Sequence, residues 1–289
     1  MIFASPNARG AFFMVICMAG FSMNDALIKL MSQELGLFQM IFLRGLFASV
    51  LIGLLWWQSG ERISRPSRTD LRMMGWRLLG EIGGTVCFLL AIFNMPLANA
   101  TAILQAMPLA VTLAAALFLG EKVGWRRYVS IGVGFIGMLI IVRPGADSFN
   151  YFSLSAVAAC GFLVLRDMST RQLSPNLPSR FITFITAVSI TTMGGLISLF
   201  FPWAPVTLAS LSVLAVAAVF VVAGYLFGVM AMRIGDVGAV APFRYSVLLF
   251  ATVLGVLLFD EWPNNTTLLG GAILVATGVY SLRQAVRKH

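Results

Sequence analysis

Long apolar runs separated by short polar connections make up almost the whole chain. A helix that spans a membrane needs about 20 mostly apolar residues, and ten runs approach this length. The runs do not alternate between polar and apolar residues, as the strands of a membrane barrel would, so each predicts a helix. The predicted helices cover residues 11–31, 36–57, 77–95, 97–118, 127–143, 152–170, 181–201, 209–231, 237–258 and 266–282.

The two halves of the chain repeat one pattern. Residues 98–141 and 238–282 each contain an apolar run, an acidic turn and a glycine-rich apolar run, at a period near 140 residues. Two repeats of five helices must enter the membrane from opposite sides, because five is odd. The sequence therefore predicts an all-α integral membrane protein with inverted repeats over residues 1–145 and 146–289, in which the glycines of the fifth and tenth helices serve packing.

Composition and charge support a membrane location. The chain is 59% hydrophobic and 11% charged, against about 25% charged in soluble domains, and its mean hydropathy is +0.92. The net charge of +9 follows the positive-inside rule, which predicts cytoplasmic N- and C-termini and excludes a nucleic-acid partner. Residues on the predicted cytoplasmic side are Arg9, Arg62, Arg65, Arg68, Arg72, Arg77, Lys122, Arg126, Arg127, Arg166, Arg171, Arg180, Arg233, Arg283, Arg287 and Lys288; the other side holds Lys29 and Arg143.

Few residues are suited to metal binding or catalysis. Cys17, Cys87 and Cys160 fall inside apolar runs at unrelated spacings, and the only histidine is His289. We therefore expect no metal site, no disulfide framework and no cofactor. No nucleotide-binding or hydrolase motif occurs, so an intramembrane enzyme is a remote alternative. A channel or scaffold is the other alternative to a transporter.

The chain resembles the EamA domains of the drug/metabolite transporter superfamily. The resemblance rests on ALFLGEKVGWRRYVSIGVGFIGMLIIV, on FLRGLFASVLIGLL with its intramembrane Arg44, and on APFRYSVLLFATVLGVLLFDEWP. It implies ten helices around a central cavity, which is lined by helices 1–4 and 6–9. Within the family the chain is similar to YddG-like amino-acid exporters, and NDALIKLM and PFRYSVLLF also resemble carriers of riboflavin or S-adenosylmethionine. The seventh helix has no counterpart to Arg44, so the two halves of the cavity are not chemically equivalent.

Charged residues inside predicted helices mark the candidate site, because such residues are costly in a membrane. Asp25 and Lys29 share one face of the first helix, and Arg44 lies at a similar depth on the second, so we expect them to meet in the outer half. Glu81 and Arg244 are expected to meet in the inner half. Two alternatives stay open: Lys29 snorkels to the outer interface, and Glu81 pairs with Arg77 one turn before it.

Polar uncharged residues and two prolines complete the candidate set. Asn24, Gln105, Tyr225 and Tyr245 are expected to line the cavity or gate it. Pro108 and Pro242 interrupt the fourth and ninth helices and are hinge candidates. A static kink is the alternative for both prolines.

These observations predict a secondary transporter of the bacterial inner membrane. The predicted activity is export of small amphiphilic metabolites, chiefly neutral and aromatic amino acids, by alternating access between the repeats. Uptake or exchange of riboflavin or S-adenosylmethionine is the alternative. The predicted partners are a small-molecule substrate and the lipid bilayer, and a monomer is compatible with the sequence.

Overall fold

The chain folds into a bundle of long helices in a computed structural model that describes residues 5–60, 66–120, 124–144, 150–174, 177–234 and 237–286. These residues contain helices and no strands, as predicted. The elements are α1 Pro6–Met31, α2 Leu37–Ser59, α3 Arg68–Asn94, α4 Leu97–Leu104, α5 Met107–Phe118, α6 Trp125–Val142, α7 Phe152–Arg171, α8 Ser179–Ser198, α9 Leu208–Ile234, α10 Val237–Val240, the 3₁₀ helix η1 Ala241–Ser246, α11 Val247–Phe259 and α12 Asn265–Val286.

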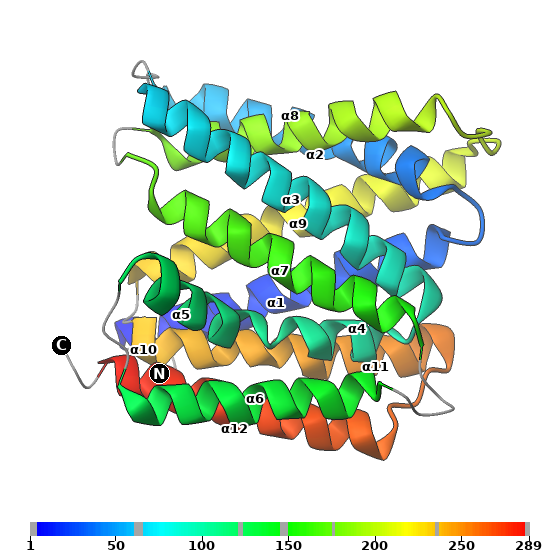
Figure 1. Ribbon diagram of the computed structural model, residues 1–289. Coiled ribbons are helices and arrows are strands. Elements are labelled where there is room, and N and C mark those ends of the chain that lie inside the picture. Colours follow the sequence, from blue (N-terminus) through cyan, green and yellow to red (C-terminus); the bar gives the residue numbers. More distant parts are fainter. Residues whose placement is uncertain are drawn as a thin grey trace.

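Nine helical segments within the described residues are long and apolar enough to cross a membrane. Two of them are composite, α4 with α5 and η1 with α11. The helix α12 has 22 residues and packs along α6. Figure 1 shows these helices running roughly parallel to one long direction, with the start of α1 and the end of α12 at the same end of the bundle. We call this the basic end, because Arg68, Arg126 and Arg180 lie in the first turns of helices that begin there.

The helix termini explain where the predicted boundaries move. The third helix starts at Arg68 rather than at residue 77, because Ser67 and Asp70 form a capping box that continues the helix into a polar segment. Asp70 Oδ1 also accepts a hydrogen bond from the Ser174 amide, 2.9 Å away, which ties the start of α3 to the turn after α7. The acidic turn at Glu121 and Lys122 lies outside the described residues, as do Arg62, Arg65, Arg287 and Lys288.

The packing of the helices follows the repeat. The most extensive contacts join α1 to α9, α3 to α7, α2 to α8 and α6 to α12. By their order in the two halves, α1 corresponds to α7, α2 to α8, α3 to α9 and α6 to α12. Under this exchange the α1–α9 pair becomes the α7–α3 pair, and the α2–α8 and α6–α12 pairs stay the same. In Figure 1, α2 and α8 form one side of the bundle and α6 and α12 form the opposite side.

Matched side-chain contacts support the same exchange. Phe21 on α1 packs over Gly224 on α9, and Phe162 on α7 packs over Gly83 on α3. A Cβ atom at Gly224 would lie 2.9 Å from the Phe21 ring, and one at Gly83 would lie 2.6 Å from the Phe162 ring. A side chain at either glycine would displace the ring that packs over it. Phe162 lies 141 positions after Phe21, and Gly224 lies 141 positions after Gly83.

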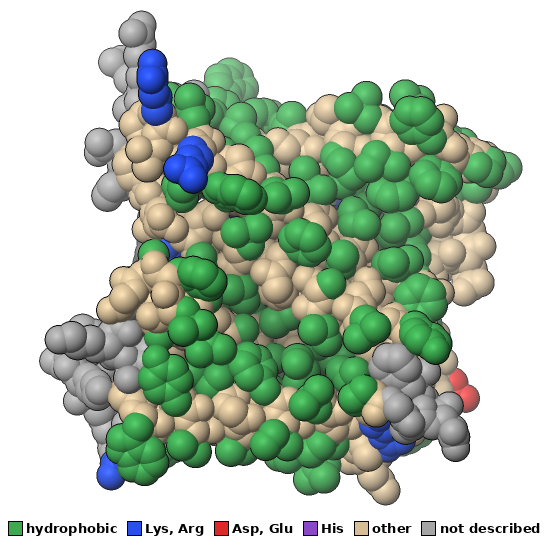
Figure 2. Space-filling view, viewed as in Figure 1, with side chains coloured by type: hydrophobic (Ala, Val, Ile, Leu, Met, Phe, Trp, Pro, Cys, Tyr) green, Lys and Arg blue, Asp and Glu red, His purple; other side chains and the backbone are tan. Residues whose placement is uncertain are grey.

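The surface between the two ends is suited to a bilayer. Figure 2 shows a face that is mostly apolar, with Lys and Arg side chains at its ends. The exposed aromatic residues gather near the helix ends, as interfacial belts do in membrane proteins. They include Trp57, Trp76 and Trp125 toward the basic end and Tyr151, Trp203 and Trp262 toward the far end.

Candidate functional site

A hydrogen-bonded chain of polar side chains joins α1 to α2 inside the bundle. The Arg44 guanidinium donates from Nη1 to Asn24 Oδ1 at 3.0 Å, and Asn24 Nδ2 donates to Asp25 Oδ1 at 2.9 Å. Asn24 is only 3% exposed, whereas Asp25 and Arg44 are half-buried. Asp25 lies six residues before the end of α1 and Arg44 seven residues after the start of α2, so both are about two turns from the far end.

Arg44 and Asp25 interact electrostatically across Asn24 without forming a direct ion pair. Among the described residues neither Arg44 nor Asp25 forms an ion pair within 4 Å. The Nε atom of Arg44 is buried and also lacks a hydrogen-bond partner there. Charged side chains inside a membrane protein that make no direct ion pair are candidates for a functional site.

Tyr225 on α9 adds an aromatic surface to this region. Its ring packs edge-on against Phe21, with centroids 5.3 Å apart, yet 40% of the residue is exposed. Its hydroxyl interacts electrostatically with Glu81 first, then with Arg166 and Arg77, and also with Arg44. We call Asn24, Asp25, Arg44 and Tyr225 the central polar group; it draws on α1, α2 and α9.

Glu81 is the centre of a second cluster, together with Arg77, Arg166 and Asp167. Glu81 pairs with Arg166 at 3.4 Å and with Arg77 at 3.8 Å. Arg166 also pairs with Asp167 at 2.8 Å, and Arg77 Nη1 donates to Thr170 Oγ1 at 2.5 Å. The cluster is compensated, with two arginines against two carboxylates, and it fastens α3 to α7.

The expected pair between Glu81 and Arg244 is wrong, and the alternative with Arg77 is confirmed. Arg244 lies in η1, which packs on α1 rather than on α3, is exposed, and forms no ion pair within the described part of the chain. Glu81 is also deeper than expected. Because α3 begins at Arg68, Glu81 stands at the middle of the helix, 13 residues from either end.

Lys29 does not join Asp25 and Arg44. Its Nζ atom pairs with Glu261 Oε1 at 2.5 Å, donates to the Met95 carbonyl at 2.8 Å, and lies 5.1 Å from the centroid of the Phe259 ring. Glu261 Oε2 accepts a hydrogen bond from the Leu97 amide at 2.8 Å. The Lys29 side chain is 9% exposed, so it does not snorkel to the interface.

Glu261 is the functional candidate that sequence reasoning missed. The sequence showed Glu261 as part of the acidic turn that the two repeats share. It did not indicate that the Glu261 carboxylate pairs with Lys29 near the end of the first helix. The pair joins the end of α1 to the turns before α4 and after α11. The pair therefore connects the two repeats at the far end of the bundle.

The fourth helix is interrupted as predicted. Two 3₁₀-type hydrogen bonds, Gln105 N to Ala102 O and Ala106 N to Ile103 O, separate α4 from α5. The Gln105 side chain donates to the Thr101 carbonyl at 3.3 Å, and Pro108 lies in the first turn of α5. Gln105 thus caps the break.

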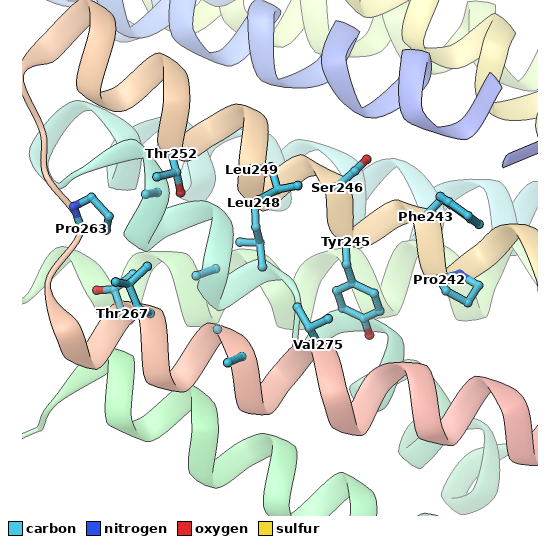
Figure 3. Close-up of a pocket in the computed structure, with 15 residues that line it drawn as sticks. Pro242, Phe243, Tyr245, Ser246, Leu248, Leu249, Thr252, Pro263, Thr267 and Val275 are labelled. Atoms are coloured by element: carbon cyan, nitrogen blue, oxygen red, sulfur yellow. The ribbon is translucent and has the colours of Figure 1, made fainter. Parts of the chain in front are cut away.

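The ninth helix is interrupted at Pro242, in the 3₁₀ helix between α10 and α11. Pro242 and Tyr245 line a largely apolar pocket of about 420 Å³ among α4, η1, α11 and α12. Figure 3 shows the Tyr245 ring pointing from η1 toward α12. Phe243, Leu249 and Leu268 line the same pocket and are exposed, which places it on the outer side of the bundle, away from the central polar group.

The sequence matches the model of the EamA-like transporter family twice, over residues 8–143 and 151–283. A solved crystal structure with 16% sequence identity has the same fold, with a TM-score of 0.67, and the match covers 96% of this chain and 98% of that one.

Three relatives are similar over nearly their whole length. The S-adenosylmethionine uptake transporter of Rickettsia conorii is 26% identical, and the match covers 97% of this chain and 96% of the relative. The pseudopaline exporter CntI of Pseudomonas aeruginosa is 30% identical over 92% and 93%. The riboflavin transporter of Vibrio cholerae is 27% identical over 97% and 95%. All three are transporters, and the chain belongs to the EamA-like transporter family.

Proposed function

We propose that this chain is a secondary transporter that exports amino acids across the bacterial inner membrane. It spans the membrane ten times, as inverted repeats over residues 1–145 and 146–289, with both termini in the cytoplasm. The helix contacts that map onto each other when the repeats are exchanged support this arrangement. So do the arginines at the basic end, since cytoplasmic segments are enriched in Arg and Lys.

The observation that carries the proposal is Arg44 inside the bundle, which makes no direct ion pair among the described residues and whose buried Nε atom has no hydrogen-bond partner there. A guanidinium can hold a carboxylate with two parallel hydrogen bonds, and Arg44 has donors left for this purpose. The exposed face of Tyr225 offers contact to an apolar or aromatic side chain. Arg44 and Tyr225 lie on α2 and α9, which belong to different repeats, as expected for a site at the repeat interface.

Alternating access assigns roles to the other candidate residues. The Lys29–Glu261 pair closes the far end, and the Glu81 cluster holds α3 to α7 on the side nearer the basic end. Opening either end requires the corresponding contacts to separate. The breaks at Pro108 and Pro242 are the hinges, Gln105 supports the first of them, and Arg244 lies beside the second.

The second candidate function is uptake or exchange of S-adenosylmethionine or riboflavin. The relatives from Rickettsia conorii and Vibrio cholerae support it, because each match covers 97% of this chain. Since the pseudopaline exporter is 30% identical over 92% of this chain, relatives of comparable similarity differ in direction and substrate.

Counterflow in proteoliposomes tests the proposal. Vesicles containing the purified protein are preloaded with methionine, threonine, phenylalanine, riboflavin or S-adenosylmethionine, and uptake of the labelled compound is followed. We expect accelerated exchange of amino acids, reduced at least tenfold in Arg44→Ala because a charge-assisted hydrogen bond is worth about 1.5–3 kcal/mol. The control Arg72→Ala, at an exposed position on α3, should keep wild-type exchange.

The pattern of exchange decides between the candidates. Exchange of S-adenosylmethionine or riboflavin without amino acids favours the second function. If the protein exchanges none of the five compounds, the proposed function is wrong.

A further inference from the structure

The two charges of the central polar group have opposite signs and share one neighbour, yet they do not touch each other. Arg44 and Asp25 are each one hydrogen bond from the Asn24 amide, at 3.0 and 2.9 Å. They do not pair with each other within 4 Å in the described structure. The other clustered ionisable side chains, at Lys29 and at Glu81, are compensated.

The direction of the two hydrogen bonds indicates what the site recognises. The Asn24 carbonyl oxygen faces the guanidinium, and the Asn24 NH₂ group faces the carboxylate. An α-amino acid also presents one acceptor group and one donor group close together, because its carboxylate accepts hydrogen bonds and its ammonium group donates them. The Asn24 side chain therefore reproduces the polarity of a zwitterion between the two charges.

We propose that Arg44, Asn24 and Asp25 form a site for the zwitterionic head group of an α-amino acid. Arg44 takes the carboxylate, Asp25 takes the ammonium group, and Asn24 sets the distance between them. The inference rests on the proposed transport function and names its substrate class. It includes S-adenosylmethionine, which carries this head group, and excludes riboflavin, which does not.

The asymmetry between the repeats makes this a single site. With the offset of 141 residues that relates Phe21 to Phe162, Arg166 is the counterpart of Asp25, and Ile185 is the counterpart of Arg44. Arg166 is paired with Glu81 and Asp167. The two matching positions of the second repeat, both within the described residues, thus hold no separated pair of opposite charges, and one head group binds per molecule.

The remainder of the substrate meets an aromatic surface. Tyr225 interacts electrostatically with Arg44 and is 40% exposed, while Phe21 supports its ring from α1. Gly224 is required for this arrangement because Phe21 occupies the space of a side chain there. An aromatic substrate side chain can pack on Tyr225 while its head group binds Arg44 and Asp25.

Ligand binding to purified protein in detergent tests the site independently of transport. The probes are phenylalanine, S-adenosylmethionine, riboflavin, 3-phenylpropionate (which lacks the ammonium group) and phenethylamine (which lacks the carboxylate). We expect Kd values for 3-phenylpropionate and phenethylamine that are tenfold to a hundredfold above that of phenylalanine, because each loses one charge-assisted interaction.

The variant Asp25→Asn keeps an acceptor for Asn24 and removes the charge. We expect it to bind phenylalanine about tenfold to a hundredfold more weakly and to lose its preference over 3-phenylpropionate. Asp25→Glu should recover part of the affinity, and Glu34→Gln, at an exposed position beyond α1, should bind like wild type. Monodisperse elution and an unchanged ligand-free Tm show that Asp25→Asn is folded.

The inference is overturned if all three phenyl compounds bind wild type equally, if riboflavin alone binds, or if none of the probes binds. It is also overturned if folded Asp25→Asn binds phenylalanine like wild type. Zwitterion-selective binding without counterflow would instead support the site while contradicting the proposed transport function.

Discussion

At the residue scale, the ionisable side chains inside this bundle differ in whether they form direct ion pairs. Lys29 has a carboxylate and a carbonyl within hydrogen-bond distance, and Glu81 has two arginines. Arg44 and Asp25 have only an amide between them. Because a charge in a membrane is costly without a partner, Arg44 and Asp25, which form no direct ion pair, are the better candidates for substrate binding. The directly paired groups are better explained as ties between helices.

The Lys29–Glu261 pair leads to a stability prediction. Removing one partner of a buried ion pair leaves an unpaired charge and costs about 3–5 kcal/mol. The side chains here are 9% and 19% exposed, so we expect Lys29→Met to fall at the lower end of that range. Thermal unfolding of the purified protein in detergent should show a clear decrease in Tm.

The double variant Lys29→Met/Glu261→Gln provides the comparison. It leaves no unpaired charge and keeps an acceptor for the Leu97 amide, so it should recover most of the lost stability. Glu34→Gln is the surface control, expected within about 0.5 kcal/mol of wild type. Equal losses in the single and the double variant would show that the pair's charges do not determine stability.

At the element scale, glycines set how closely α6 and α12 approach each other. A Cβ atom at Gly270 on α12 would lie 2.5 Å from the carbonyl oxygen of Gly137 on α6. The predicted packing role of these glycines is therefore confirmed for this pair. Gly132 on α6, by contrast, would place a Cβ atom in open space, so glycine is not required there for contact.

This difference predicts opposite results for two similar substitutions. Gly270→Ala should separate α6 from α12, and overpacking of this kind costs about 1–3 kcal/mol. Gly132→Ala should be neutral within about 0.5 kcal/mol. The measurement is Tm in detergent for both variants, and a loss at Gly132 as large as that at Gly270 would contradict the assigned contact.

The helix termini show what local sequence can decide. The capping box at Ser67 and Asp70 is readable in the sequence, and including it would have placed the start of the third helix correctly. The two proline interruptions followed from the missing amide hydrogen of proline. The 3₁₀ turns that separate α4 from α5 depend also on Gln105, whose side chain covers the Thr101 carbonyl.

At the scale of the whole molecule, the proposed orientation can be tested in cells. Gln58 is exposed near the basic end and Gln33 is exposed near the far end. After Cys17, Cys87 and Cys160 are replaced by Ala, we expect a membrane-impermeant maleimide to label Gln33→Cys in intact cells. Gln58→Cys should react only after the inner membrane is permeabilised. Labelling with the sides reversed would overturn the cytoplasmic assignment of the termini.

The helical class, nearly all helix positions and the repeat could be predicted from the sequence. Hydrophobic run length and periodicity are local properties that a membrane makes decisive, because the backbone of each span must satisfy its own hydrogen bonds. The apolar runs and their acidic turns also indicated the resemblance to the EamA family. The family match over residues 8–143 and 151–283 confirms this resemblance.

The partners of the charged residues were decided by the tertiary structure. Depth along a helix indicated which charges lie at similar levels, but not which faces meet. Lys29 pairs with Glu261, 232 residues away, because the end of α1 lies beside the turn after α11. Glu81 pairs with Arg166 because α3 packs on α7. The meeting of Asp25 and Arg44 could be predicted from their similar depth, whereas only the tertiary structure places the Asn24 amide between them and leaves Lys29 out.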